Sequence, residues 1–125
     1  MDNLVLNPWI YKATYISNYD GDTIRFLRDC GCNVFHTVTV RLWGIDTPEL
    51  RSKDIIEKEK AYEARDVVKK ILTEANCIYI ETIKGKKGKY GRYIANIWYA
   101  EKKLGELFCL NEELVNRGLA VYREY

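Results

Sequence analysis

The chain contains 125 residues, of which 47% are hydrophobic and 30% are charged. These values are typical of one globular domain, and they exclude an intrinsically disordered chain and a miniature fold that depends on disulfide bonds. The 20 Lys and Arg residues nearly balance the 18 Asp and Glu residues, so the net charge of +2 indicates no particular class of partner.

Residues 1–8 are expected to form an N-terminal tail, followed by a single domain over residues 9–125. The tail has neither the basic start nor the continuous apolar stretch of a secretory signal. No segment approaches the about 20 apolar residues that a membrane-spanning helix needs, so no membrane partner is expected. The compartment is left open: the cytoplasm if the chain is complete, or outside the cell if a leader has been removed.

Two strands joined by a turn are predicted next. Residues 9–19 have a β-like pattern, Asp20-Gly21-Asp22 is a strong turn signal, and residues 23–27 resume the β pattern. These segments are expected to pair as a hairpin. A second turn over residues 29–33 leads to the third strand.

The third strand has the clearest alternation in the chain. Val38, Val40 and Leu42 point to one face, which turns Arg41 toward the other. Arg41 is therefore free to meet Asp22 if the preceding strand pairs beside it.

The rest of the chain adds a long helix, two strands and a short helix. Apolar residues recur at helical spacing over about residues 57–75, and β-like runs over 77–82 and 93–99 flank a glycine-rich loop. Residues 111–117 form a short helix that Gly118 ends. This order predicts a β-rich α+β fold. We expect a five-stranded Greek-key barrel of the oligonucleotide-binding (OB) type, with one long helix between strands 3 and 4 and a short C-terminal helix.

The four cysteines do not form a convincing metal site. Cys30 and Cys32 are separated by one residue, fewer than zinc knuckles use, and His36 is the only histidine. Cys77 and Cys109 lie in apolar surroundings that are typical of small core residues. Free thiols are therefore expected, and the role of Cys30 and Cys32 is left open.

Three carboxylates are candidate ligands of a hard cation. Asp22 follows the first turn, and Asp46 and Glu49 follow the third strand, where the Thr47 carbonyl can add another oxygen. An all-oxygen set selects a cation such as Ca²⁺ or Mg²⁺. Beside such a cation, Glu49 could also orient or deprotonate a water. The structural alternative is that Asp20 and Asp22 serve the turn. In that reading Asp46 caps a bend and Glu49 is simply exposed.

Arg41 and Arg92 are candidate phosphate clamps, because a guanidinium stays charged and can donate two parallel hydrogen bonds. Together with a cation they could stabilise the charge that develops during cleavage of a phosphodiester. The structural alternatives are a salt bridge from Arg41 to Asp22 or Glu49, and an ordinary surface position for Arg92.

The loop over residues 84–92 carries five basic residues and no acidic one. Such a loop suits a polyanion such as nucleic acid, and Tyr90 could stack on a base or bond a phosphate oxygen. The structural alternative is a solvated hairpin tip.

Four motifs together resemble the thermonuclease (staphylococcal nuclease) family. In chain order they are Asp20-Gly-Asp-Thr23, Arg41-Leu-x-Gly-Ile-Asp-Thr-Pro-Glu49, Tyr90-Gly-Arg92 and Asn111-x-x-Leu-Val-x-x-Gly-Leu-Ala120. Each motif is weak alone, but four in register are specific, and they cover nearly the whole chain from about residue 10. The chain departs from the family at Gly88, where an acidic residue is frequent. A tyrosine of the substrate pocket matches Tyr122 and Tyr125 equally well.

The resemblance implies an OB barrel that hydrolyses DNA and RNA with little sequence specificity, depends on Ca²⁺ and leaves 3′-phosphate ends. A metal-bound water would attack phosphorus. The residues carried over by position are Asp22, Asp46 and Thr47 for the metal, Arg41, Glu49 and Arg92 for catalysis, and Lys89 and Tyr90 for the substrate.

Three functions remain open from the sequence. The first is a calcium-dependent nuclease, expected to be a monomer that prefers single-stranded DNA or RNA. The second is a catalytically inactive module that binds single-stranded nucleic acid, and the third is a structural or protein-interaction domain. A pure binding module does not need the full set of carboxylates and arginines, which favours the nuclease. The sequence does not indicate the biological role or the preferred nucleic acid.

Overall fold

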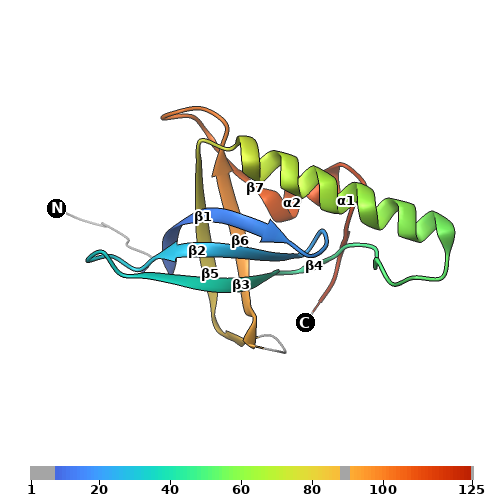
Figure 1. Cartoon of the computed structure of the whole chain (residues 1–125), viewed down its shortest axis with the longest axis horizontal. Helices are drawn as coiled ribbons and strands as arrows, with labels where there is room; N and C mark the ends of the chain where they lie inside the picture. Colours follow the sequence, from blue (N-terminus) through green and yellow to red (C-terminus); the bar gives the residue numbers. More distant parts are fainter. Residues whose placement is uncertain (1–7, 88–90, 125) are drawn as a thin grey trace.

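Three antiparallel strands build the first half of a barrel in the computed structural model, which describes residues 8–87 and 91–124. They are β1 (Ile10–Asn18), β2 (Thr23–Asp29) and β3 (Phe35–Leu42) (Figure 1). β2 lies between β1 and β3, and its register sets Thr23 opposite Arg41. The predicted hairpin around the first turn is therefore present, and the start of β2 lies beside the end of β3.

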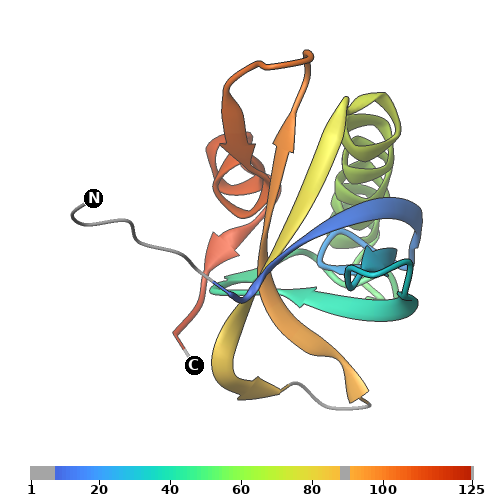
Figure 2. The ribbon, with the colours of Figure 1, turned by 90° about the vertical axis from the view of Figure 1, so that its left-hand side faces the viewer.

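Two long strands close the barrel. β5 (Cys77–Lys87) pairs with β1, and β6 (Tyr93–Ala100) pairs with β5 in antiparallel and with β3 in parallel orientation. Because the β3–β6 pairing joins the two edges of the sheet, five strands form a closed mixed barrel. The predicted five-stranded OB barrel is confirmed. In Figure 2, β5 (yellow) and β6 (orange) cross near the middle of the molecule and extend from its upper part to its bottom.

The long helix α1 (Ile55–Glu74) lies along one side of the barrel (Figure 1). It begins at Asp54, whose side chain accepts a hydrogen bond from the Ile56 backbone N–H at 3.0 Å. The predicted apolar face is confirmed. Its fully buried members are Ala61, Ala64, Val68 and Leu72, and Ile71 and Ala75 pack against the core at its edge.

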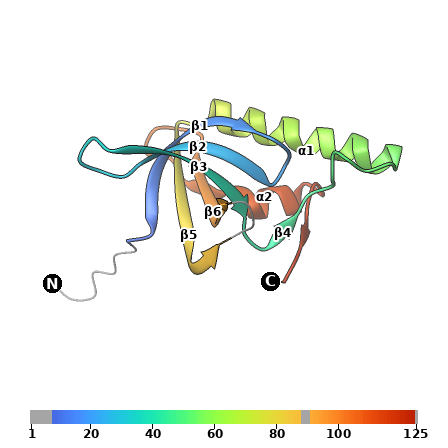
Figure 3. The ribbon, with the colours of Figure 1, turned by 60° about the horizontal axis from the view of Figure 1, so that its bottom comes forward.

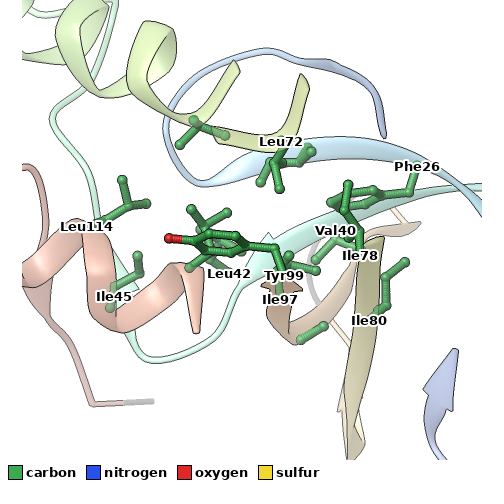
Figure 4. Packing of buried hydrophobic residues seen from close by; sticks show 14 of the residues in the cluster. Phe26, Val40, Leu42, Ile45, Leu72, Ile78, Ile80, Ile97, Tyr99 and Leu114 are labelled. Carbon is green, nitrogen blue, oxygen red and sulfur yellow. The ribbon is translucent and has the colours of Figure 1, made fainter. Parts of the chain in front are cut away.

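The core fills the space between the barrel strands and both helices (Figure 4). The predicted alternation on β3 is confirmed, because Val38, Val40 and Leu42 are all buried. They pack with residues from every other layer, including Phe26 from β2 and Ile97 from β6. This rigid interior holds the ends of β1, β2 and β3 in fixed positions.

Three short strands were not predicted. β4 (Ile45–Asp46) pairs with β8 (Val121–Tyr122), and β7 (Leu107–Cys109) adds to β6. Figure 3 shows β4 beside the strand that leads to the C-terminal end. Strands of two or three residues are too short to show an alternation, so the sequence carries no pattern for them. The predicted strand over 77–82 also continues further, to Lys87.

The short helix α2 (Leu110–Asn116) ends as predicted at Gly118, whose φ of 74° is left-handed. Asn111, only 4% exposed, fastens this helix to the barrel. Its amide donates to the Trp43 carbonyl at 2.9 Å, and its side-chain oxygen accepts from the Ile97 backbone N–H at 3.1 Å. Asn111, the first residue of the fourth sequence motif, therefore has a structural role.

The expected free thiols are found: Cys30 and Cys32 are exposed, Cys77 is half-buried and Cys109 is buried. Burial raises the pKa of the Cys109 thiol, which is typical of an inert core cysteine. None of the helices in the described part of the chain has the length and apolar composition needed to cross a bilayer.

Candidate active site

The turn between β1 and β2 is held by Asp20. Its Oδ1 accepts hydrogen bonds from the backbone N–H groups of Asp22 at 3.0 Å and Thr23 at 2.8 Å. Burial, and then the neighbouring charge of Asp22, raises the pKa of Asp20 to about 6. Asp20 therefore holds the turn, as the structural alternative expected. The Asp22 side chain instead contacts Thr47 and Arg41, outside the turn.

Gly21 lets this turn approach the loop after β4 and helix α1. A Cβ at this position would lie 2.7 Å from Thr47 Cγ2 and 3.0 Å from Ala64 Cβ. Any larger residue would separate the three segments. The absence of a side chain at Gly21 thus sets how closely Asp22 and Thr47 can meet.

Asp22 is buried and bonded across the site. It is 7% exposed, its Oδ2 accepts from the Thr47 backbone N–H at 3.1 Å, and the same oxygen lies 3.4 Å from Arg41 Nη1. These contacts are long-range in sequence, so Asp22 is not simply a turn residue. Its carboxylate is held next to the loop that carries Asp46.

Arg41 joins the two aspartates, as its predicted direction on β3 allows. Its Nη1 donates to the Leu42 carbonyl at 2.9 Å and faces Asp22, while its Nη2 pairs with Asp46. The residue is only 9% exposed. A buried guanidinium between two carboxylates fixes their separation and lowers their mutual repulsion.

The loop from β4 presents three more oxygen-bearing side chains. The Asp46 carboxylate, 38% exposed, pairs with Arg41 on one side. Thr47 is buried, and its Oγ1 has no hydrogen-bond partner among the described residues. Glu49 is exposed, and within the same residues its carboxylate makes no hydrogen bond or ion pair.

Arg92 approaches from the start of β6. It is half-buried, and its Nη1 lies 3.4 Å from the Thr23 hydroxyl. The parallel pairing of β3 with β6 sets Tyr93 opposite Val40 and Ile94 opposite Arg41, so Arg92 lies next to the half of β3 that carries Arg41.

One open cavity of about 760 Å³ collects these groups. The predicted residues that line it are Asp22, Arg41, Asp46, Thr47, Glu49 and Arg92. Lys89 and Tyr90 lie outside the described residues, so their predicted contact with substrate remains a prediction. Tyr122, one of two candidates for a pocket tyrosine, is 69% exposed and is absent from the lining.

The oxygen donors fit a hard cation in their chemistry. Within residues 8–87 and 91–124, no three His, Cys, Asp or Glu side chains lie together so that they could hold a metal ion, so the three-carboxylate site expected from Asp22, Asp46 and Glu49 is not formed. The set implied by the family resemblance has two carboxylates, those of Asp22 and Asp46, with the Thr47 carbonyl. The hydroxyl of Thr47 is itself buried and has no hydrogen-bond partner among the described residues. Two carboxylates and loop oxygens suit a cation that completes its shell with water.

Thr23 and Arg123 also line the cavity, although neither was predicted as a site residue. Thr23 follows the Asp20 turn and holds Arg92, which only the three-dimensional structure can show. Arg123 pairs with Asp46 at 3.2 Å because β8 runs beside β4. That two-residue pairing leaves no signal in the sequence.

The comparisons with known proteins agree with the motifs. The family model described as "Staphylococcal nuclease homologue" matches residues 39–125, a range that includes Arg41, Asp46, Glu49 and Arg92. The chain is also 33% identical over 119 residues to a thermonuclease from Staphylococcus hyicus. That match covers 95% of this chain but 62% of the relative, so the chain spans under two thirds of the relative's length. This chain is a member of the staphylococcal nuclease homologue family.

Proposed function

We propose that this chain is a calcium-dependent phosphodiesterase that hydrolyses DNA and RNA with little sequence specificity. One observation carries the proposal: Arg41 bridges Asp22 and Asp46 inside an open cavity that Glu49 and Arg92 also line. The family membership supports the same chemistry. A substrate phosphate in this cavity would lie near two carboxylates that can bind a cation. It would also lie near two guanidinium groups that can pair with its negative charge.

The arginines bind and polarise the phosphate. Arg41 and Arg92 enter the cavity from different strands, so they can grip different oxygens of one phosphate. Their fixed positive charge stabilises the five-coordinate phosphorus as negative charge builds on its oxygens. Neither side chain needs to gain or lose a proton during the reaction.

Glu49 is the proposed general base. Its exposed carboxylate can accept a proton from a water in the cavity. The oxygen of that water forms a bond to phosphorus while the bond to the 5′ oxygen of the next nucleotide breaks, and this oxygen takes a proton from solvent in the open cavity. The products are a 3′-phosphate and a 5′-hydroxyl end.

Asp22, Asp46 and the Thr47 carbonyl would hold the Ca²⁺. When bound, the cation neutralises phosphate charge and lowers the pKa of nearby water. Asp22 has its place fixed by the Thr47 N–H and Arg41, so its carboxylate is preorganised before a cation arrives.

The proposed substrates are single strands in preference to duplexes, bound by a monomer. The cavity is open, and OB barrels commonly bind extended single strands. Lys89 and Tyr90 are proposed to contact the terminal phosphate of the bound strand, in line with the family resemblance.

The test is cleavage of labelled single- and double-stranded DNA and RNA, with Ca²⁺, with Mg²⁺ and with chelator. We expect Ca²⁺ to restore cleavage after chelation, and the new 3′ ends to resist polymerase extension until a phosphatase has removed the phosphate. An Asp22→Asn variant purified in parallel controls for contaminating nuclease. A folded protein that binds oligonucleotides in a salt-dependent way but never cleaves them would support the inactive binding module instead.

A further inference from the structure

Arg123 forms an ion pair inside the proposed cation site. Its Nη1 lies 3.2 Å from Asp46 Oδ1 and 3.3 Å from Asp46 Oδ2, so one nitrogen faces both carboxylate oxygens. The pairing of β4 with β8 sets Val121 opposite Asp46, and the Arg123 backbone N–H donates to the Gly44 carbonyl at 2.8 Å. The backbone pairing therefore places the Arg123 guanidinium next to Asp46.

The two arginines on Asp46 differ in how firmly they are held. Arg41 is buried and also bonded to Leu42 and Asp22. The Arg123 side chain is 54% exposed and extends from a short strand near the C-terminal end. Exposed ion pairs between long side chains are weak and exchange readily. Arg123 is thus the partner of Asp46 that an incoming cation can displace.

We propose that Arg123 competes with Ca²⁺ for Asp46 and, once displaced, pairs with the phosphate of the substrate. This inference rests on the proposed function and adds a coupling between cation and substrate. Arg123 lines the same cavity as Arg41 and Arg92, so a phosphate there is within the region that its side chain reaches. Phosphate that draws Arg123 away from Asp46 raises the affinity for the cation, and the cation raises the affinity for phosphate to the same degree.

The first experiment measures Ca²⁺ binding by isothermal titration calorimetry without nucleotide. We expect Arg123→Ala to bind Ca²⁺ more tightly than wild type, by about three- to tenfold, because an exposed competitor has been removed. Arg123→Lys keeps the charge without the fork and should fall between the two. Arg117→Ala is the matched control, since it removes an arginine from an exposed pair with Glu113 outside the cavity. Its Ca²⁺ affinity should equal that of wild type.

The second experiment measures binding of deoxythymidine 5′-phosphate at saturating Ca²⁺. Arg123→Ala should bind this mononucleotide several-fold more weakly than wild type, because the released guanidinium is missing. Unchanged or weaker Ca²⁺ binding by Arg123→Ala, while wild type binds and cleaves normally, would overturn this inference alone. If neither protein binds Ca²⁺, the inference and the proposed calcium dependence are both wrong. Thermal unfolding of each variant establishes that it is folded.

Discussion

Arg41 and Arg92 both bring a guanidinium to the cavity, but only Arg41 also belongs to the buried structure. It is 9% exposed and pairs with Asp22, which is 7% exposed. Removing one partner of a buried pair leaves the other charge without compensation, which is costly. Arg92 is half-buried, and its Nη1 makes a long hydrogen bond to the Thr23 hydroxyl.

The first prediction separates stability from activity at these two positions. Arg41→Met should lower the free energy of unfolding by about 3–5 kcal/mol, whereas Arg92→Met should lower it by about 1 kcal/mol. Both variants should lose at least about 10²-fold in kcat with Ca²⁺ present. Urea unfolding and single-substrate kinetics measure the two effects. Equal midpoints for the two variants would show that Arg41 has no special structural role.

The second prediction concerns Glu49, whose exposed carboxylate makes no ion pair within the described residues. Glu49→Gln should lose at least about 10²-fold in kcat, since the amide cannot accept the proton. Its unfolding midpoint should stay unchanged. Glu106→Gln, in an exposed position outside the cavity, is the matched control and should keep full activity. Normal turnover by Glu49→Gln would mean that another group accepts the proton.

At the level of elements, the site depends on the close contact of the β1–β2 turn, α1 and the loop after β4. The third prediction tests it with Gly21→Ala. The new methyl would lie 2.7 Å from Thr47 Cγ2, so the turn or the loop must move, at a cost of about 1–3 kcal/mol. Because Asp22 moves with the turn, activity should fall as well.

Gly31→Ala provides the comparison for that variant. Gly31, in the turn between β2 and β3, has a φ of 83° but open space around it. The substitution should cost about 1–2 kcal/mol of backbone strain and leave activity intact. If Gly21→Ala keeps full activity too, the packing around Gly21 does not position Asp22.

The elements also show what the sequence could and could not predict. The alternation of Val38, Val40 and Leu42, the spacing along α1 and the cap at Gly118 are local patterns, and the structure confirms all three. The meeting of Asp22 with Arg41 followed from hairpin pairing. The contact of Arg123 with Asp46 could not be predicted, because it depends on two strands of two residues each, far apart in sequence.

For the whole molecule, the cation and the substrate should stabilise the folded state, because the proposed ligands lie together only there. The fourth prediction is that Ca²⁺ at about 100 times its Kd raises stability by about 2.7 kcal/mol, or on the order of 10 °C in Tm. Calorimetric scans with Ca²⁺ and with chelator measure this shift. Asp46→Asn should lose most of this Ca²⁺-dependent rise in Tm, and Arg117→Ala should keep all of it. An identical Tm with and without Ca²⁺ would contradict the assignment of the cation site.

The parallel pairing of β3 with β6 also determines when the site can assemble during synthesis and folding of the chain. Asp22, Arg41, Asp46 and Glu49 all precede α1, whereas Arg92 and the strand that closes the barrel come much later in the chain. A chain that is still being synthesised carries the carboxylates long before the second guanidinium exists. The barrel can close only after β6 has emerged, and long-range pairing of this kind is a late and slow event in folding. An unfinished chain on the ribosome therefore lacks the assembled form of the proposed phosphate site.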